Sequence, residues 1–215
     1  MTGSTFLQRL QSGEILVSDG ATGTNLQARG LTRGTPSEVW VLENPQEILR
    51  LHSDFVAAGS DIILTSTFGG STLRLQHAGL SERAEEVNRR AVELARQAAG
   101  EKALVAGSLG PLGQMMQPLG PLSEEEAGAA YAAQAKVLSE AGVDLLLVET
   151  QFDLAEATAA VNAARSVSSL PLVCSFSYDR GTRTMMGVKP AQMAKHIGAL
   201  GVDALGINCG RSLEE

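Results

Sequence analysis

The chain has 215 residues, a net charge of −7 and 44% hydrophobic residues, which excludes a disordered protein and fits one globular domain. Aromatic residues make up only 4% of the chain, so we expect an aliphatic core. The acidic balance, with no cluster of Lys and Arg, argues against nucleic acid or an anionic membrane as partner and leaves small molecules as the expected ligands.

The first half of the chain shows one complete strand and helix unit. Residues 15–17 and 61–64 are short, mainly apolar runs that are followed by polar residues, a pattern typical of buried parallel strands. Between them, Asn44 is a candidate N-cap for a helix whose first residue is Pro45, and Gly59 follows as its expected end. Strands and helices are therefore expected to alternate.

The same alternation continues to the end of the chain. Ser123 and Glu126 have the spacing of a capping box, and Asp153 with Glu156 repeats it. We expect helices from these two caps to Gly142 and to Ala164, and a third helix over residues 193–200. Four more apolar runs predict strands at residues 103–106, 144–148, 172–176 and 204–207.

Six strands alternating with helices fit either an open doubly wound sheet or a closed barrel. The turn after the first strand, DGATGT, lacks the glycine spacing of a dinucleotide-binding loop, which favours the barrel. We predict an α/β fold, a (β/α)8 TIM barrel of which about six βα units are present. Residues 1–215 would then form one incomplete barrel domain that lacks its last two units. Ser212 and Glu215 have capping-box spacing and predict the start of a further helix.

Targeting signals and cysteine content narrow the class of protein further. No run of about 18 apolar residues occurs, and the first residues do not have the basic-then-apolar order of a signal peptide. We therefore expect a cytoplasmic protein without a membrane partner. Cys174 and Cys209 are the only cysteines, too few for a disulfide framework and too few by themselves for a structural zinc site.

Ligands of parallel barrels bind at the carboxyl ends of the strands, so the residues that end each predicted strand are the candidate site. Asp19 and Glu149 can hold an ammonium group, and the backbone N–H groups of residues 20–24 can hold a carboxylate, which suits an amino acid. The other candidates at these ends are Thr65 to Thr67, Ser108, Ser175 to Ser177, Asn208 and Cys209.

Each candidate also has a purely structural interpretation. Asp19 can brace its own turn, Glu149 can cap the next helix, and Cys209 can be an inert core residue. Cys174 lies inside a predicted strand and is expected in the core. The three histidines of the chain are expected to be structural or solvated. An aldolase or a phosphate-binding barrel is disfavoured because no Lys ends a strand.

Five segments resemble the homocysteine S-methyltransferase family, in the family's order. They are DGATGT at 19–24, NPQEILRLHSDFVAAGSDIILTSTFGG at 44–70, AGSLGP at 106–111, AGVDLLLVETQFDLAEA at 141–157 and GINCG at 206–210. Within the family, the chain is most similar to the N-terminal homocysteine-binding module of cobalamin-dependent methionine synthases.

The resemblance implies a site and a metal. In the family, zinc is held by three cysteine thiolates, and it deprotonates the homocysteine sulfur while leaving it nucleophilic. Cys209 matches the first ligand, and the cysteine pair of the family's GGCC motif has no counterpart in the 215 residues. Among the substrate-binding residues that the resemblance implies, Asp19 and Glu149 orient the amine. Gly20 and Ala21 receive the carboxylate, and Asn208 and Thr67 support the pocket.

The resemblance also implies an activity. The chain would be a module that activates homocysteine for methyl transfer to give methionine, with methylcobalamin as donor. Cobalamin would be carried on another module, and folate- and cobalamin-binding modules of the same polypeptide would be partners. The 215 residues alone are expected to be inactive because two zinc ligands are missing. The alternatives are a free-standing methyltransferase that uses betaine or S-methylmethionine, and a non-catalytic barrel fragment that a partner completes.

Overall fold

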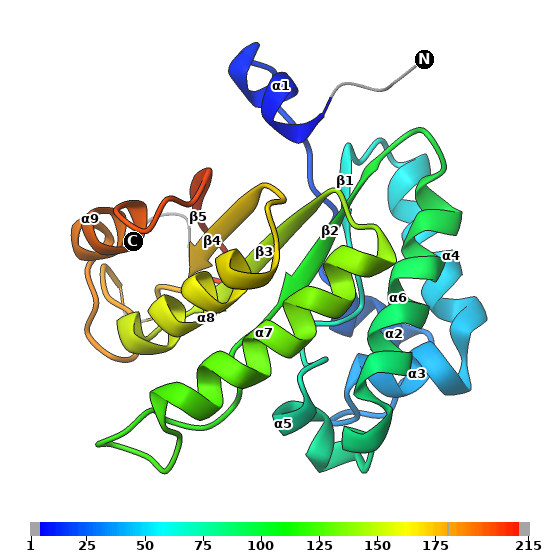
Figure 1. Cartoon of the computed structure of the whole chain (residues 1–215). Coiled ribbons are helices and arrows are strands. Elements are labelled where there is room, and N and C mark those ends of the chain that lie inside the picture. The colour runs from blue at the N-terminus through cyan, green and yellow to red at the C-terminus, as the bar shows by residue number, and fades with distance from the viewer. Residues whose placement is uncertain (1–4, 180, 211–215) are drawn as a thin grey trace.

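A computed structural model describes residues 5–179 and 181–210 of the chain. Its centre is a five-stranded parallel sheet in which the strands are neighbours in chain order (Figure 1). The edge strands of this sheet are β1 and β5, which do not pair with each other within the described residues. The strands are β1 (Ile62–Leu64), β2 (Leu104–Leu109), β3 (Leu145–Gln151), β4 (Leu172–Phe176) and β5 (Ala204–Ile207).

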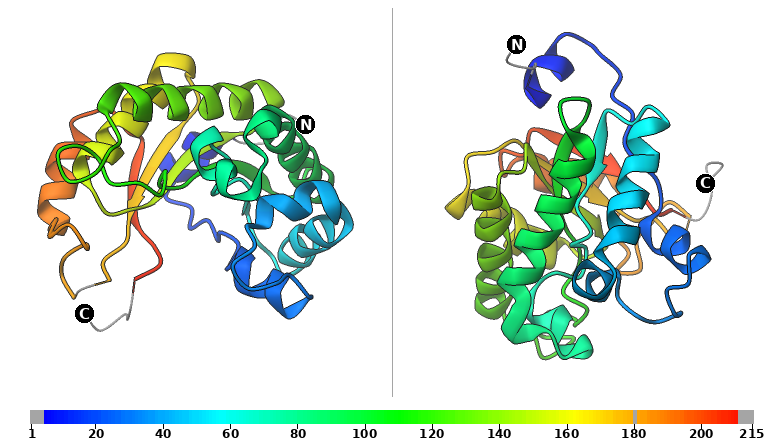
Figure 2. Two further views of the ribbon diagram at one scale, coloured as in Figure 1. Left: turned by 90° about the horizontal axis from the view of Figure 1, so that it is seen from below. Right: turned by 90° about the vertical axis from the view of Figure 1, so that its right-hand side faces the viewer.

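Helices cover the outer face of the curved sheet. In the left view of Figure 2 they follow one another in an arc, from α4 in cyan to α9 in orange. Neighbouring helices along this arc, such as α6 with α7 and α7 with α8, pack against each other. The helices are α1 (Phe6–Gln11), α2 (Thr22–Ala28), α3 (Ser37–Glu43), α4 (Pro45–Ala57), α5 (Thr72–Leu75), α6 (Ala84–Ala99), α7 (Glu124–Ala141), α8 (Leu154–Val167) and α9 (Pro190–Gly198), with short 3₁₀ turns at Gln76–Ala78 and Ser81–Arg83.

The α/β class and the parallel sheet are therefore confirmed, whereas a closed barrel of six units is not seen in the described residues. The missing unit is the first predicted strand, residues 15–17. This segment runs beside β1, where the Asp61 and Ile62 N–H groups donate to the Val17 carbonyl, but only a single bridge between Ser18 and Ile62 forms. The Ile15 side chain is 88% exposed, because no described residue packs over it or pairs with the other side of the segment.

Strands β4 and β5 have the predicted limits, while β2 and β3 run three residues further than predicted. The sequence predicts that β2 and β3 end where polar residues begin. In the structure the strands continue through these polar residues because other polar groups meet their hydrogen-bonding needs. For example, the Ser108 N–H in β2 donates to the Thr65 hydroxyl at 3.1 Å. The helix predicted at Ser212 lies outside the described residues.

Two predicted helix caps differ from the expectation. Asn44 precedes α4 at the N-cap position, but its side chain makes no capping hydrogen bond. Asp153 caps α8 by accepting from the Ala155 N–H, whereas Glu156 does not return to the cap. Instead Glu156 is buried and accepts from the Leu112 N–H at 2.6 Å. The Glu156 carboxylate therefore makes a tertiary hydrogen bond and not the local capping bond that its spacing predicts.

The core is aliphatic, as predicted, and has two sides. Outside the sheet, apolar residues of β1 to β4 pack against α6 to α9, and many of the helix residues are alanines that allow close approach. Inside the curved sheet, Phe6 of α1 packs with Ile62, Ala106 and Leu145. Helix α1 thus covers the N-terminal end of the inner face. The hydrophobic periodicity of the sequence does not predict that α1 packs in this position.

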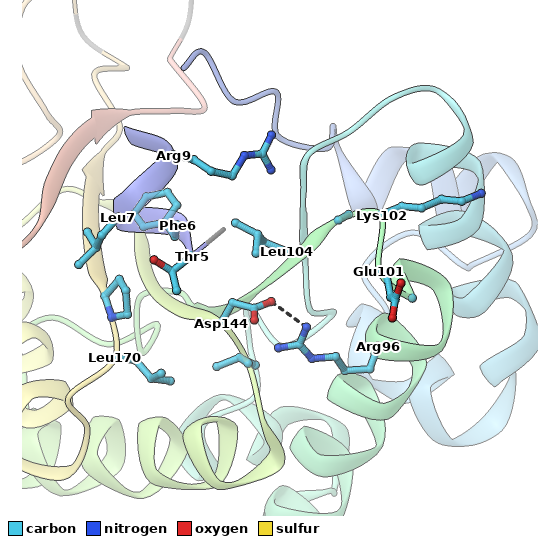
Figure 3. A pocket seen from close by; sticks show the side chains of 14 residues that line it. Thr5, Phe6, Leu7, Arg9, Arg96, Glu101, Lys102, Leu104, Asp144 and Leu170 are labelled. Atoms are coloured by element: carbon cyan, nitrogen blue, oxygen red, sulfur yellow. Dashed lines mark ion pairs between the residues drawn. The ribbon is translucent and has the colours of Figure 1, made fainter. Parts of the chain in front are cut away.

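A cavity of about 900 Å³ lies beside α1, at the amino ends of the strands, and is called the N-terminal cavity here (Figure 3). Its two arginines are already paired: Arg96 with Asp144 at 2.7 Å, and Arg9 with Glu14 and Asp61. Ligands of parallel α/β folds bind at the opposite end of the strands.

None of the helices in the described ranges is both long and apolar enough to cross a membrane.

The capping box that opens α7 gives a test of the local structure. The Ser123 hydroxyl accepts from the Glu126 N–H at 3.2 Å, and the Glu126 carboxylate accepts from the Ser123 N–H at 3.0 Å. We expect Ser123→Ala to lower the free energy of unfolding by about 1 kcal/mol, measured by urea denaturation, because the first turn loses its cap. Ser53→Ala is the control: its exposed hydroxyl bonds only the Leu49 carbonyl within α4. A change within about 0.5 kcal/mol is expected there, and equal losses in both variants would contradict the capping role.

Candidate functional site

A cavity of about 560 Å³ opens at the carboxyl ends of the strands, and we call it the first cavity. It brings together six of the seven predicted site residues, which come from separate parts of the chain. Asp19, Gly20 and Ala21 come from the segment beside β1, Glu149 from β3, and Asn208 and Cys209 from the turn after β5. Other lining residues are Ser18, Thr22, Gly23, Thr24, Ser37, Leu64, Thr65, Ser66, Phe68, Ser108, Leu147, Thr150 and Ser175.

Thr67 is the exception among the predicted residues. It is fully buried and does not line the first cavity. Its hydroxyl donates to the Ser108 carbonyl at 2.8 Å and lies 2.6 Å from the Thr65 hydroxyl. Both of these neighbours do line the cavity. Thr67 therefore supports the wall from behind and does not itself line the first cavity, and its place among the substrate-binding residues stays a prediction.

Asp19 is fixed to the edge of the sheet. Its N–H donates to the Ile62 carbonyl at 2.9 Å, and its Oδ2 accepts from the Leu64 N–H at 2.9 Å. The carboxylate thus braces β1, not its own turn. Burial, with a smaller contribution from the nearby Glu149 charge, raises the pKa of Asp19 to about 6. A cationic ligand group beside it would stabilise the ionised form.

Glu149 is half-buried near the end of β3 and is surrounded by donors. Its Oε1 accepts from the Ser108 hydroxyl at 2.5 Å, and its Oε2 accepts from Asn208 Nδ2 at 3.1 Å. Burial raises the pKa of Glu149, and these hydrogen bonds oppose part of the rise. The interpretation of Glu149 as a helix cap is wrong, because Asp153 fills that position.

Asn208 ties three strand ends together. Its Nδ2 donates to Glu149 Oε2 and to Thr150 Oγ1, the latter at 2.7 Å. Its Oδ1 accepts from the Thr150 N–H at 3.1 Å and from the Ser175 hydroxyl at 2.8 Å. Both donors and both lone pairs of the amide are therefore in use. Asn208 positions Glu149 and has no free hydrogen-bonding capacity for a ligand.

Thr150 is the residue that sequence reasoning missed. It has φ of 59°, a left-handed conformation that is costly for a β-branched residue, and the pairing of β3 with β4 shifts register there. This conformation turns the Thr150 hydroxyl toward Glu149 Oε2, at 3.3 Å, and toward Cys209 Sγ, at 3.9 Å. Only its place directly after Glu149 could have drawn attention to it.

Cys209 lies at the mouth of the first cavity and is exposed. Its backbone is also left-handed, with φ of 53°, and the Asn208 Nδ2 lies 3.5 Å from its sulfur. The interpretation of Cys209 as an inert core residue is wrong. Cys174, by contrast, is fully buried, and burial raises the pKa of its thiol to about 12. It belongs to the core, as predicted.

The charge of the first cavity has one sign. Its ionisable carboxylates are Asp19 and Glu149, and no Lys, Arg or His among residues 5–179 and 181–210 lines it. The hydroxyl of Ser66 is buried in the wall and has no hydrogen-bond partner in the described part of the chain. The first cavity therefore favours a small ligand with a cationic group and a further polar group that Ser66 can bind.

A metal ion would need more ligands than the described residues supply. Within residues 5–179 and 181–210, no group of three or more His, Cys, Asp or Glu residues could hold one. Cys209 offers one thiolate, whereas a catalytic zinc takes three protein ligands. The donor set described here does not by itself fit zinc.

The fold and the cavity define an α/β protein with an acidic small-molecule site at the carboxyl ends of its parallel strands. Residues 16–215 match the homocysteine S-methyltransferase family, and the chain belongs to that family. It is similar to betaine–homocysteine S-methyltransferase 1 of Danio rerio, with 32% identity over 94% of this chain and 50% of the relative. It is also similar to methionine synthase of Mycobacterium tuberculosis, with 29% identity over 95% of this chain and 18% of the relative.

The structure is similar to the metallated form of the homocysteine methyltransferase MmuM from Escherichia coli. The TM-score is 0.82 at 27% sequence identity, and the match covers 97% of this chain and 79% of that one. The chain spans about half the length of the betaine–homocysteine relative it matches. The family expectation from the sequence is confirmed.

The raised pKa of Asp19 predicts a pH effect on stability. An ordinary Asp ionises near 3.8, so between about pH 4 and 6 the unfolded chain releases a proton that folded Asp19 retains. The unfolding free energy contributed by Asp19 therefore falls as the pH rises through this window, by at most about 3 kcal/mol and by less where water reaches the carboxylate.

We expect Asp19→Asn to remove this fall while keeping an oxygen for the Leu64 N–H. The measurement is urea unfolding of both proteins at pH 4, 5, 6 and 7. The stability of Asp19→Asn relative to the unmodified chain should rise with pH. A difference that stays constant from pH 4 to 7 would show that burial does not shift this group.

Proposed function

We propose that the chain is a homocysteine S-methyltransferase module that binds homocysteine in the first cavity. One observation carries the proposal: Asp19, Glu149 and Cys209 line the same cavity, and no basic side chain of the described residues lines it with them. In this arrangement Asp19 and Glu149 hold the substrate ammonium. The backbone at Gly20 and Ala21 receives the carboxylate, which directs the thiol toward Cys209.

Zinc is part of the proposal because the residue that matches the family's first ligand lies at the cavity mouth. Cys209 would be that ligand, with its sulfur positioned by Asn208 and Thr150. Two further thiolates would have to come from outside the described residues, in keeping with the proposal that residues 1–215 form an incomplete barrel domain.

The methyl donor predicted from the resemblance, methylcobalamin, stays a prediction. The similarity to a methionine synthase supports it, together with the predicted cobalamin and folate modules, and the similarity to a betaine–homocysteine enzyme supports the alternative. The product in either case would be methionine. A cytoplasmic location also stays a prediction.

A second candidate function is a binding module that another polypeptide completes. It is favoured by the outer face of β5, where Ile207 is 64% exposed and Leu205 37% exposed, unlike the buried Phe176 and Cys174 beside them in β4. Such an uncovered edge pairs readily with further chain. Size-exclusion chromatography distinguishes the two, because a stable monomer that binds homocysteine needs no partner for its site.

Binding of L-homocysteine to the chain, followed by isothermal titration calorimetry under reducing conditions at pH 7.5, tests the proposed site. We expect Asp19→Asn and Glu149→Gln each to weaken binding at least about tenfold, because each removes a charge that faces the ammonium group. Binding to the unmodified chain should also weaken below about pH 6, where Asp19 takes up a proton.

Two controls separate the ammonium contact from general damage. Glu82→Gln changes an exposed carboxylate far from the strand ends and should leave the affinity unchanged. 4-Mercaptobutanoic acid, which is homocysteine without its amine, should bind the unmodified chain and Asp19→Asn about equally. Unaltered homocysteine affinity in both site variants would contradict the proposal.

A further inference from the structure

Two carboxylates that do not line the first cavity are buried beside the loops that follow β1 and β2. Glu38 in α3 and Glu156 in α8 are each only 2% exposed. Each accepts a hydrogen bond from the backbone of one loop: Glu38 Oε1 from the Gly69 N–H at 2.5 Å, and Glu156 Oε1 from the Leu112 N–H at 2.6 Å. Burial of a carboxylate is costly, so each of these contacts needs a physical reason.

Glu38 joins two segments of the wall of the first cavity. Its Oε1 bonds Gly69, which directly follows Phe68, and its Oε2 accepts from the Ser37 hydroxyl at 3.4 Å. Ser37 and Phe68 both line the first cavity, whereas Glu38 does not. Glu38 and Gly69 are 31 positions apart in the chain. The carboxylate therefore fastens the start of α3 to the loop after β1 from behind the wall.

The contact between Glu38 and Gly69 is close and charge-assisted. A Cβ atom at position 69 would lie 3.3 Å from Glu38 Oε1, closer than ordinary van der Waals contact, so glycine lets the carboxylate reach the N–H. Burial raises the pKa of Glu38, and the N–H groups of Glu38 and Gly69 and the charge of Arg74 oppose part of the rise. Both oxygens act as acceptors, as the ionised form requires.

The loop that Glu38 holds is a tight turn. The Thr67 N–H donates to the Thr65 carbonyl at 2.8 Å, and the Gly70 N–H donates to the Thr67 carbonyl at 2.9 Å. Ser66 lies within this turn and lines the first cavity, where its buried hydroxyl has no hydrogen-bond partner among the described residues. Because the turn is short and internally bonded, a shift at Gly69 also moves Ser66.

We infer that Glu38 is a positioning residue of the homocysteine site, which holds the loop after β1 so that the Ser66 hydroxyl stays in the wall where a ligand can bind it. The inference rests on the proposed function, because it assigns a further residue to the binding of homocysteine. Glu38 does not touch the ligand and acts through the loop. Preorganised walls of this kind need a supporting layer of polar contacts behind them.

Glu156 provides a matched control within the same chain. It has the same exposure as Glu38, accepts one loop N–H over nearly the same distance, and the charge of Arg74 favours the ionised form of both carboxylates. Its hydrogen-bond donors, the Leu112 N–H and the Tyr131 hydroxyl, belong to residues that do not line the first cavity. Loss of either charge should lower stability, but only loss of Glu38 should disturb the wall.

The test compares Glu38→Gln with Glu156→Gln by calorimetric titration with L-homocysteine, at a temperature at which circular dichroism shows both variants to be folded. We expect Glu38→Gln to weaken homocysteine binding at least about fivefold, because a neutral amide holds the Gly69 N–H less firmly than a carboxylate does. Glu156→Gln should stay within about twofold of the unmodified chain, although urea unfolds both variants at lower concentrations. A purely structural role of Glu38 would change the two affinities equally.

A double-mutant cycle then tests whether Glu38 acts through Ser66. Ser66→Ala removes the hydroxyl that the loop presents, so a further loss of its position has little left to disturb. We expect the variant with both Glu38→Gln and Ser66→Ala to bind homocysteine no more than about twofold more weakly than Ser66→Ala alone. Losses that simply add would overturn the inference.

Hydrogen exchange of the unmodified chain decides the question if Glu38→Gln does not fold. The Gly69 amide, held by Glu38, is compared with the Leu112 amide, held by Glu156. Homocysteine should slow exchange at Gly69 at least about threefold more than at Leu112, because the ligand stabilises the wall that Glu38 supports. Equal slowing of the two amides would overturn the inference.

Failure of this inference and failure of the proposed function give different results. If the unmodified chain does not bind homocysteine, the proposed function is overturned, and the role of Glu38 with it. If the unmodified chain and Glu38→Gln bind homocysteine equally well, or if Glu38→Gln and Glu156→Gln weaken binding to the same extent, Glu38 does not position the site and the proposed function stands.

Discussion

The arrangement of the site depends on the side-chain amide of Asn208. Four of its hydrogen bonds join the ends of β3 and β4 to the turn after β5, and they fix the positions of Glu149 and Thr150 relative to each other. Parallel strands bring their carboxyl ends to one edge, but they do not by themselves set the rotamers there. Asn208 sets these rotamers. Because its hydrogen-bonding capacity is fully used, Asn208 orients Glu149 and Thr150 and does not itself bind a ligand.

A cost accompanies this arrangement. Asp19 and Glu149 are both partly removed from water, and this burial raises the pKa of each. Donors from Leu64, Ser108 and Asn208 compensate only part of the lost hydration. The ammonium group of a ligand would supply the hydrogen bonds and the opposite charge that replace this hydration, so the stability lost by burying two carboxylates is regained on binding. Sites built this way bind cations because the empty state is electrostatically unfavourable.

The sequence predicted the strands well because short apolar runs that end in polar residues are a local pattern. It also placed Asp19, Glu149 and Cys209 at the same end of the sheet, because the carboxyl ends of parallel strands all lie there. It could not predict that Glu156 accepts from the Leu112 N–H and not from its cap, or that Thr67 is buried behind the wall of the first cavity, because both depend on packing between distant segments. The left-handed backbone of Thr150 has no local signal in the sequence either.

The contrast between the two cysteines has a practical consequence. Cys174 is sealed in the core with a thiol that stays protonated, whereas Cys209 faces solvent at the cavity mouth. A maleimide or an iodoacetamide dye would therefore attach at a single place, without any engineered substitution. Fluorescence from a label there would report, from within the folded chain, when the neighbouring pocket fills and empties.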